Sequence, residues 1–116
     1  MAIIRVEEKD NYFMMHLEGD FVGGDEINDL RENLRKYATL EKNRLIVDLR
    51  KVSYANSTAL GVFLSANAFF ERNKGKIVLC NLSDYLVNIF TITKLTFIFT
   101  LYKTAEEAAE DVLKNE

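Results

Sequence analysis

The sequence predicts an α/β domain with a mostly parallel mixed sheet, an N-terminal antiparallel hairpin at its edge, and helices covering the sheet. Two runs with alternating apolar and polar residues, 2–8 and 12–18, lie close enough along the chain to pair as that hairpin. After them, segments with helical spacing alternate with short apolar runs, which is typical of parallel strands joined by right-handed crossovers. The expected order of elements is β-β-α-β-α-β-α-β-α.

Size and composition limit the classes of protein that fit. The chain has 116 residues, 48% of them hydrophobic, which suits one packed domain over residues 1–116. A net charge of −3 and scattered Lys and Arg argue against a nucleic-acid binder. The single cysteine, Cys80, has no partner for an internal disulfide, so a reducing, cytoplasmic setting is expected. No apolar stretch reaches the length of a membrane span, so none is expected.

The first half of the chain supplies the hairpin, one helix and one buried strand. We expect a loop over 19–24 and a helix that starts at Asp25, with acidic residues near its positive end. One face of this helix is apolar at spacings of three and four: Ile27, Leu30, Leu34, Tyr37 and Ala38. The strand that follows is expected over 44–49, with a turn over 51–55.

The second half alternates helices and short strands. A helix is expected from about Ser57 to Asn73, with Gly75 at its end, before a buried strand over 76–81. Ser83 begins the next helix, which ends near residue 94, and a last strand is expected over 97–99. Thr104 and Glu107 have the spacing of a capping box, which indicates a final helix over 104–113.

The central helix, from Ser57, has two apolar faces. The larger holds the aromatic residues and is assigned to the sheet: Ala59, Val62, Phe63, Ala66, Phe69 and Phe70. The smaller holds Leu60, Leu64 and Ala68, with Gly61 beside it and Ser57 on the same side. Neighbouring helices could cover this second stripe, or it could dock a partner, including a second copy in a homodimer.

Three polar residues, Asn56, Ser57 and Thr58, open this helix. Such residues most often cap a helix, which requires no further function. A phosphate on a hydroxyl here would be tolerated by free N–H groups and by the positive end of the helix dipole. The same phosphate would place negative charge at the rim of the apolar stripe and repel a fitted partner, so the site could also act as a switch.

The segment 47–66, VDLRKVSYANSTALGVFLSA, resembles the characteristic motif of STAS domains, the bacterial anti-sigma factor antagonists. The specific part is short: Asp48-Leu49 at the end of a strand, then residues 56–61 at the start of the helix. The predicted element order and the glycine and acidic residue after the second strand also fit, so the resemblance covers nearly the whole chain.

This resemblance implies a cytoplasmic protein-binding module for transcription regulation, with no catalytic activity and no cofactor or metal. In such proteins the unphosphorylated form binds an anti-sigma factor, a serine kinase of the GHKL ATPase type, and so releases a sigma factor. The kinase phosphorylates the matching serine, here Ser57, which breaks the complex, and a phosphatase reverses this. Carried over to this sequence, the resemblance implies that Ser57 is the phospho-acceptor, that Thr58 is its hydroxyl neighbour, and that Leu60, Gly61 and Leu64 belong to the docking helix. We expect the partner-binding surface also to include Ala68 of the stripe, Asn56 of the polar cluster, and Val22 and Gly23 of the loop after the second strand.

The sequence departs from the family pattern at three positions. Asn56 replaces the usual Asp, Ala59 replaces the usual Gly, and Val22 lies near a position that is often acidic. Two of these changes remove negative charge beside Ser57. An alternative is therefore an unswitched STAS interaction module or small-ligand-binding module in a stress-signalling complex.

Two further residues, Asp48 and His16, could belong to other kinds of site. Asp48 ends a central strand, as the phosphorylated aspartate of a receiver domain does, but a receiver begins β-α and needs an acidic pair for magnesium after its first strand. His16 is the only histidine and has no second histidine or nearby cysteine with which to bind metal, so we expect a surface histidine. Glycines 19, 23 and 24 lack the spacing of a nucleotide fingerprint.

Overall fold

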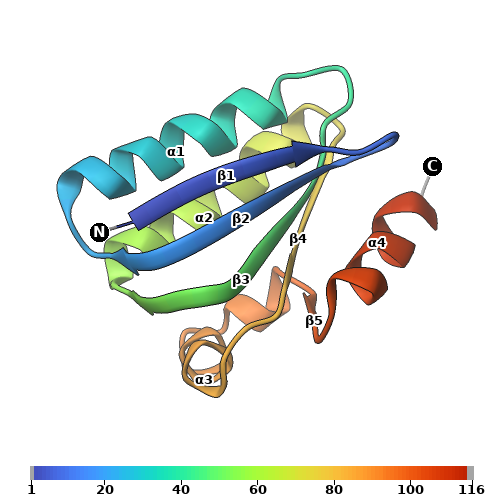
Figure 1. Cartoon of the computed structure of the whole chain (residues 1–116). Helices are drawn as coiled ribbons and strands as arrows, with labels where there is room; N and C mark the ends of the chain where they lie inside the picture. Colours follow the sequence, from blue (N-terminus) through green and yellow to red (C-terminus); the bar gives the residue numbers. More distant parts are fainter. Residues whose placement is uncertain (1, 115–116) are drawn as a thin grey trace.

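The computed structural model describes residues 2–114 and contains a five-stranded sheet in the order β1-β2-β3-β4-β5 (Figure 1). Strands β1 and β2 are antiparallel, and every other neighbouring pair is parallel. The elements, in chain order, are β1 (Ala2–Glu8), β2 (Phe13–Phe21), α1 (Gly24–Ala38), β3 (Arg44–Ala55), α2 (Ser57–Arg72), β4 (Lys76–Cys80), α3 (Asp84–Ile92), the 3-10 helix η1 (Leu95–Phe97), β5 (Leu101–Tyr102) and α4 (Ala105–Lys114). The predicted fold class and element order are confirmed.

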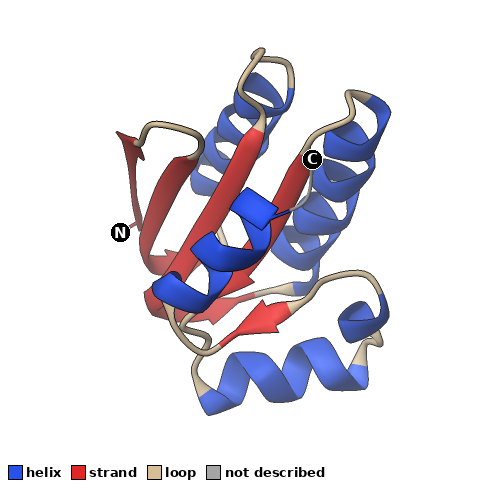
Figure 2. Ribbon diagram, turned by 90° about the vertical axis from the view of Figure 1, so that its right-hand side faces the viewer, coloured by secondary structure: helices blue, strands red, loops and turns tan. Residues whose placement is uncertain are grey.

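Helices cover both faces of the sheet, and Figure 2 shows α4 in front of it with α1 and α2 behind. The larger core joins α1, α2 and α3 to one phase of each strand, which includes Met15 and Val47. The opposite phase, which includes Met14 and Ile46, packs against Ala108 of α4. This arrangement follows from strand alternation, since successive side chains point to opposite faces. Among residues 2–114, no helix is long and apolar enough to cross a membrane.

Strand β3 continues to Ala55, so the expected turn over 51–55 is wrong. Two register shifts against β2 explain the difference: His16 pairs with Asp48 but Glu18 with Lys51, and a second shift follows Gly19. Each bulge adds a residue to β3, so burial recurs at every third residue: Leu49, Val52 and Ala55. Prediction from alternating apolar and polar residues therefore misses this part of the strand.

The strand expected over 97–99 is also wrong. Lys94 adopts a left-handed conformation (φ 66°) after α3, and the chain then forms η1. Phe99 is buried, but Phe97 is 84% exposed, so no continuous strand forms from this apolar run. The last strand is instead the two-residue β5.

Helix α2 ends as predicted near Gly75, but glycine is required there for a reason other than left-handed geometry. Lys74 is the residue with positive φ (61°). The Gly75 N–H donates to the carbonyl of Phe70 at 2.7 Å, which closes a Schellman motif. A Cβ on Gly75 would lie 2.4 Å from the backbone oxygen of Asn43, so the close approach of the two loops excludes a side chain.

Gly75→Ala should lower the free energy of unfolding by about 1–3 kcal/mol, because the added methyl forces the Asn43 loop away. Gly61→Ala is the matched control. A Cβ at Gly61 meets no atom within 4 Å, so this exposed helical position should gain up to about 1 kcal/mol. Urea unfolding of both variants measures the difference, and equal stability of Gly75→Ala and wild type would contradict the close approach.

Candidate functional site

The candidate site lies where β2 and β3 end and α2 begins. The bulged end of β3 brings Ala55 into register with Phe21 of β2. The Asn56 N–H donates to the Phe21 carbonyl at 3.3 Å, and the Asn56 side-chain nitrogen donates to the Val22 carbonyl at 3.2 Å. The loop after β2 and the start of α2, which are 34 residues apart in sequence, are therefore joined side by side. This is the carboxyl end of the parallel strands, where open α/β sheets commonly bind ligands.

Asn56 is the N-cap of α2. Its side-chain oxygen accepts the N–H of Ala59 at 3.0 Å, while its side-chain nitrogen binds Val22. An ionised aspartate could cap the helix but could not donate to the Val22 carbonyl, because a carboxylate only accepts. The asparagine that departs from the family pattern thus has a specific structural role here.

The cap leaves Ser57 and Thr58 exposed as the first two residues of α2. Ala59, the second departure, is fully buried and is not among the described residues with positive φ. Its position is helical, so it needs none of the conformational freedom of glycine. The methyl group packs in the core.

Val22 and Gly23 lie beside this cap, as the resemblance implies. Val22 is exposed, and Gly23 is the N-cap of α1, where its N–H donates to the Glu26 carboxylate at 3.2 Å. Val22 itself carries no charge, but two acidic residues, Asp25 and Glu26, follow it closely in the first turn of α1.

The second apolar stripe of α2 is shorter than predicted. Leu60 is only 7% exposed and packs in the core with Phe63 and Phe90, so its assignment to a docking surface is wrong. Leu64 is 43% exposed, and Gly61 and Ala68 are also exposed. Residues of β2, β3 and α3 surround Leu60, whereas Leu64 and Ala68 are exposed, so only the later part of the stripe is uncovered.

The 3-10 helix after α3 extends this uncovered stripe. Leu64 and Ala68 line a shallow surface hollow together with Phe97 and Ile98, both of which are exposed. The sequence placed Phe97 in a strand, so this contribution could not be predicted from it. The result is an apolar surface on one side of α2 that begins near Gly61.

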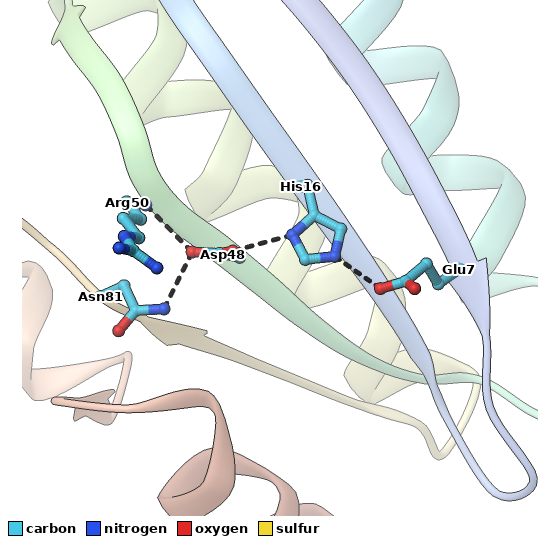
Figure 3. Close-up of polar contacts among 5 residues, drawn as sticks. All are labelled: Glu7, His16, Asp48, Arg50 and Asn81. Carbon is cyan, nitrogen blue, oxygen red and sulfur yellow. Dashed lines mark hydrogen bonds and ion pairs between the residues drawn. The ribbon is translucent and has the colours of Figure 1, made fainter.

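A polar network joins five residues on or directly after neighbouring strands (Figure 3). His16 and Asp48 share the strand phase of Met14 and Ile46, so the network lies on the face of the sheet that α4 covers. His16 bridges two carboxylates: Nδ1 lies 2.8 Å from Asp48 and Nε2 lies 2.7 Å from Glu7. The other Asp48 oxygen accepts from the Asn81 side chain and from the Arg50 N–H, each at 3.0 Å. The network thus joins β1, β2, β3 and the residue after β4.

Sequence reasoning missed this network, because it expected an isolated surface histidine. The signal existed in part: His16 and Asp48 are polar residues, each two positions after an apolar residue of the same phase, Met14 or Ile46. The register that pairs them, and the positive φ (60°) that turns Asn81 toward them, cannot be derived from spacing alone.

The hydrogen bonds of the network favour the ionised forms of its carboxylates and so help to hold the strands together. Burial raises the pKa of the Asp48 carboxyl, but hydrogen bonds from Asn81, the Arg50 N–H and His16 outweigh it, so the pKa lies below its ordinary value. The hydrogen bond from His16 also lowers the pKa of Glu7. An Asp48 carboxylate held by three donors is poorly disposed to act as a nucleophile.

Other chemistry has little support in the part of the chain that the structure describes. Residues 2–114 contain no group of three or more His, Cys, Asp or Glu arranged to hold a metal ion, which a receiver-like site at Asp48 would need. Cys80 is buried, and burial together with Asp48 raises the pKa of its thiol to about 12. It is therefore a core residue and not a reactive thiolate.

Comparison with known proteins identifies the family. The STAS domain model matches residues 4–108. The anti-sigma-B factor antagonist of Listeria monocytogenes serovar 1/2a (strain ATCC BAA-679 / EGD-e) is 39% identical over 72 residues, which are 62% of this chain and 63% of that protein. The match therefore spans less than two thirds of the relative's length.

Solved structures of low identity share the fold. An anti-sigma factor antagonist from Mycobacterium paratuberculosis superposes with a TM-score of 0.85 at 18% identity, over 97% of this chain and 94% of that chain. The antagonist SpoIIAA in its unphosphorylated form gives a TM-score of 0.75 at 17% identity, over 98% of this chain and 100% of that chain. SpoIIAA has also been solved in a phosphorylated form.

Asp48→Asn should destabilise the protein by about 1–3 kcal/mol at pH 7, because His16 then loses one of its two charged partners. A carboxyl with a lowered folded-state pKa stabilises the fold above its unfolded pKa of about 4 and loses this effect as the pH falls through the folded pKa. The stability gap between wild type and Asp48→Asn should therefore narrow below about pH 4.

Urea unfolding at pH 7 and at about pH 3 measures this gap. The control is Asp29→Asn, which changes an exposed aspartate on α1 and should have little effect at either pH. A gap of the same size at both pH values would show that the Asp48 charge does not stabilise the network.

Proposed function

The chain belongs to the STAS domain family, and we propose that it is an anti-sigma factor antagonist without catalytic activity of its own. In this proposal it binds an anti-sigma factor of the serine-kinase type and so releases a sigma factor. The names of the curated relatives support it. The observation that carries it is local: Ser57 is exposed at the first position of α2, between the Val22 loop and an uncovered apolar stripe.

The proposed docking surface combines the two sides of the Asn56 cap. On one side lie Val22 and Gly23, and on the other lie the exposed residues of α2: Ser57, Thr58, Gly61, Leu64 and Ala68. Asn56 itself is partly buried and positions both sides. A mixed apolar and polar surface on a rigid helix and a tied loop suits a reversible protein partner.

We propose phosphorylation of Ser57 as the switch. The partner kinase would transfer the γ-phosphoryl group of ATP to the Ser57 oxygen, with loss of the hydroxyl proton and release of ADP. The dianion would be stabilised by the N–H groups and dipole at the start of α2. A charge of about −1.5 to −2 near Val22, on the same side of α2 as Leu64, would disfavour the apolar contact, and a phosphatase would restore binding by hydrolysis.

A second candidate is an unswitched STAS interaction module. It is favoured by Val22 and Asn56, which supply no negative charge where family members often have one. Such a module would bind its partner through the same surface without being phosphorylated. A homodimer through the Leu64 stripe would be a further use of that surface.

The deciding experiment is incubation of the chain with the source organism's purified anti-sigma factor kinases and Mg-ATP, followed by intact-mass measurement and peptide mapping. We expect one added phosphate on Ser57, absent from Ser57→Ala and retained in Thr58→Ala. Binding without any added phosphate would favour the unswitched module. The absence of both binding and phosphorylation would overturn the proposal.

Leu64→Lys should weaken binding to the anti-sigma factor at least 100-fold, because it places a charge in the apolar contact. Its free energy of unfolding should change by less than about 0.5 kcal/mol, since Leu64 is exposed. Leu60→Ala is the contrasting variant: its side chain is buried, so it should lose about 2–5 kcal/mol of stability.

Calorimetric titration measures the binding, and urea unfolding measures the stability. Loss of cooperative unfolding in Leu64→Lys would show that the stripe belongs to the core.

A further inference from the structure

Two tyrosines form an exposed stacked pair beside the proposed docking surface. Tyr54 lies in the bulged end of β3, three residues before Ser57, and Tyr85 lies in the first turn of α3. Their ring centroids are 5.7 Å apart, and the ring planes are inclined by 24°. The side chains remain 45% and 40% exposed, so the pair is not part of the core.

Both rings are held by regular structure. Tyr54 follows the second bulge of β3, and its strand is paired with β2 up to Phe21. Tyr85 follows the cap of α3, where the Ser83 hydroxyl accepts the N–H of Leu86 at 3.2 Å. An aromatic pair fixed in this way loses little conformational entropy when a partner binds, which is the property of a binding anchor.

The charges around the pair are acidic. Asp20 is the register partner of Tyr54 on β2, and Asp84 directly precedes Tyr85, and both carboxylates are exposed. Lys51, a cation upstream on β3, lies opposite Glu18, which opposes its charge. Aromatic faces attract cations, and the planar guanidinium group of arginine stacks on them. Exposed carboxylates nearby add electrostatic complementarity for such a cation.

We propose that Tyr54 and Tyr85 bind an arginine side chain of the anti-sigma factor that docks at Ser57. This inference rests on the proposed function and adds the chemistry of one partner residue. The arginine stacks on the exposed faces of the tyrosine pair and is held by Asp20 and Asp84. Neither tyrosine lines the hollow formed by Leu64, Ala68, Phe97 and Ile98, so this contact is separate from that hollow.

The test compares two substitutions at each tyrosine in binding to the purified anti-sigma factor kinase. Tyr54→Leu and Tyr85→Leu keep an apolar side chain but remove the ring, and should each weaken binding about tenfold. Tyr54→Phe and Tyr85→Phe keep the ring face and should stay within about threefold of wild type. Ile3→Ala, an exposed residue on the edge strand β1, is the control and should have no effect.

The occupant is tested by chemical protection. Wild-type chain should protect one arginine of the anti-sigma factor from phenylglyoxal, read by peptide mass mapping, and Tyr54→Leu should not. Asp20→Asn should weaken binding and reduce its salt dependence, because it removes one charge from the contact.

Each outcome has a distinct meaning. Full binding by both Leu variants, while Leu64→Lys abolishes it, overturns the arginine contact and leaves the proposed function intact. Equal loss in the Leu and Phe variants would assign the contact to the hydroxyl groups and overturn it as well. A change in self-association alone would assign the pair to a contact between two copies. If no anti-sigma factor binds the wild-type chain, the proposed function fails and this inference fails with it.

Discussion

The geometry of the candidate site depends on Asn56. One side chain caps α2 through its oxygen and binds the loop after β2 through its nitrogen, so it joins the two halves of the site. The two bulges of β3 place Asn56 there, because they add the residues that carry the strand past Leu49 to the level of Phe21. Ser57 needs no hydrogen bond of its own to be positioned, and its hydroxyl is left on the surface.

The two faces of the sheet are stabilised by different kinds of contact. The Glu7–His16–Asp48–Asn81 network ties four neighbouring segments on the α4 side, while the apolar core packs α1, α2 and α3 on the other. A sheet tied together in this way suits the proposed function, in which the protein presents a fixed surface to a partner. Covalent modification of one exposed serine could then change the charge of that surface without rearranging the fold.

The sequence was sufficient for the fold class, the element order, the caps at Ser83 and Thr104, and the alternation of the hairpin, because each depends on local spacing or turn chemistry. It was insufficient where tertiary contacts decide. The bulges of β3 depend on its pairing with β2, the burial of Leu60 depends on α3, and the exposure of Phe97 depends on the left-handed turn at Lys94. The exposed positions of Ser57 and Leu64 on α2 could be predicted because the helix was assigned correctly, while their roles in binding remain proposals.

The most direct test of the central claim is displacement of a sigma factor. A preformed complex of the anti-sigma factor kinase and its sigma factor would be titrated with this chain without ATP, and the released sigma factor measured by fluorescence anisotropy. The account predicts release by wild type, no release by Ser57→Asp, and release by Ser57→Ala even after incubation with Mg-ATP. Release by Ser57→Asp equal to wild type would contradict the charge switch, and no release by wild type would contradict the antagonist function.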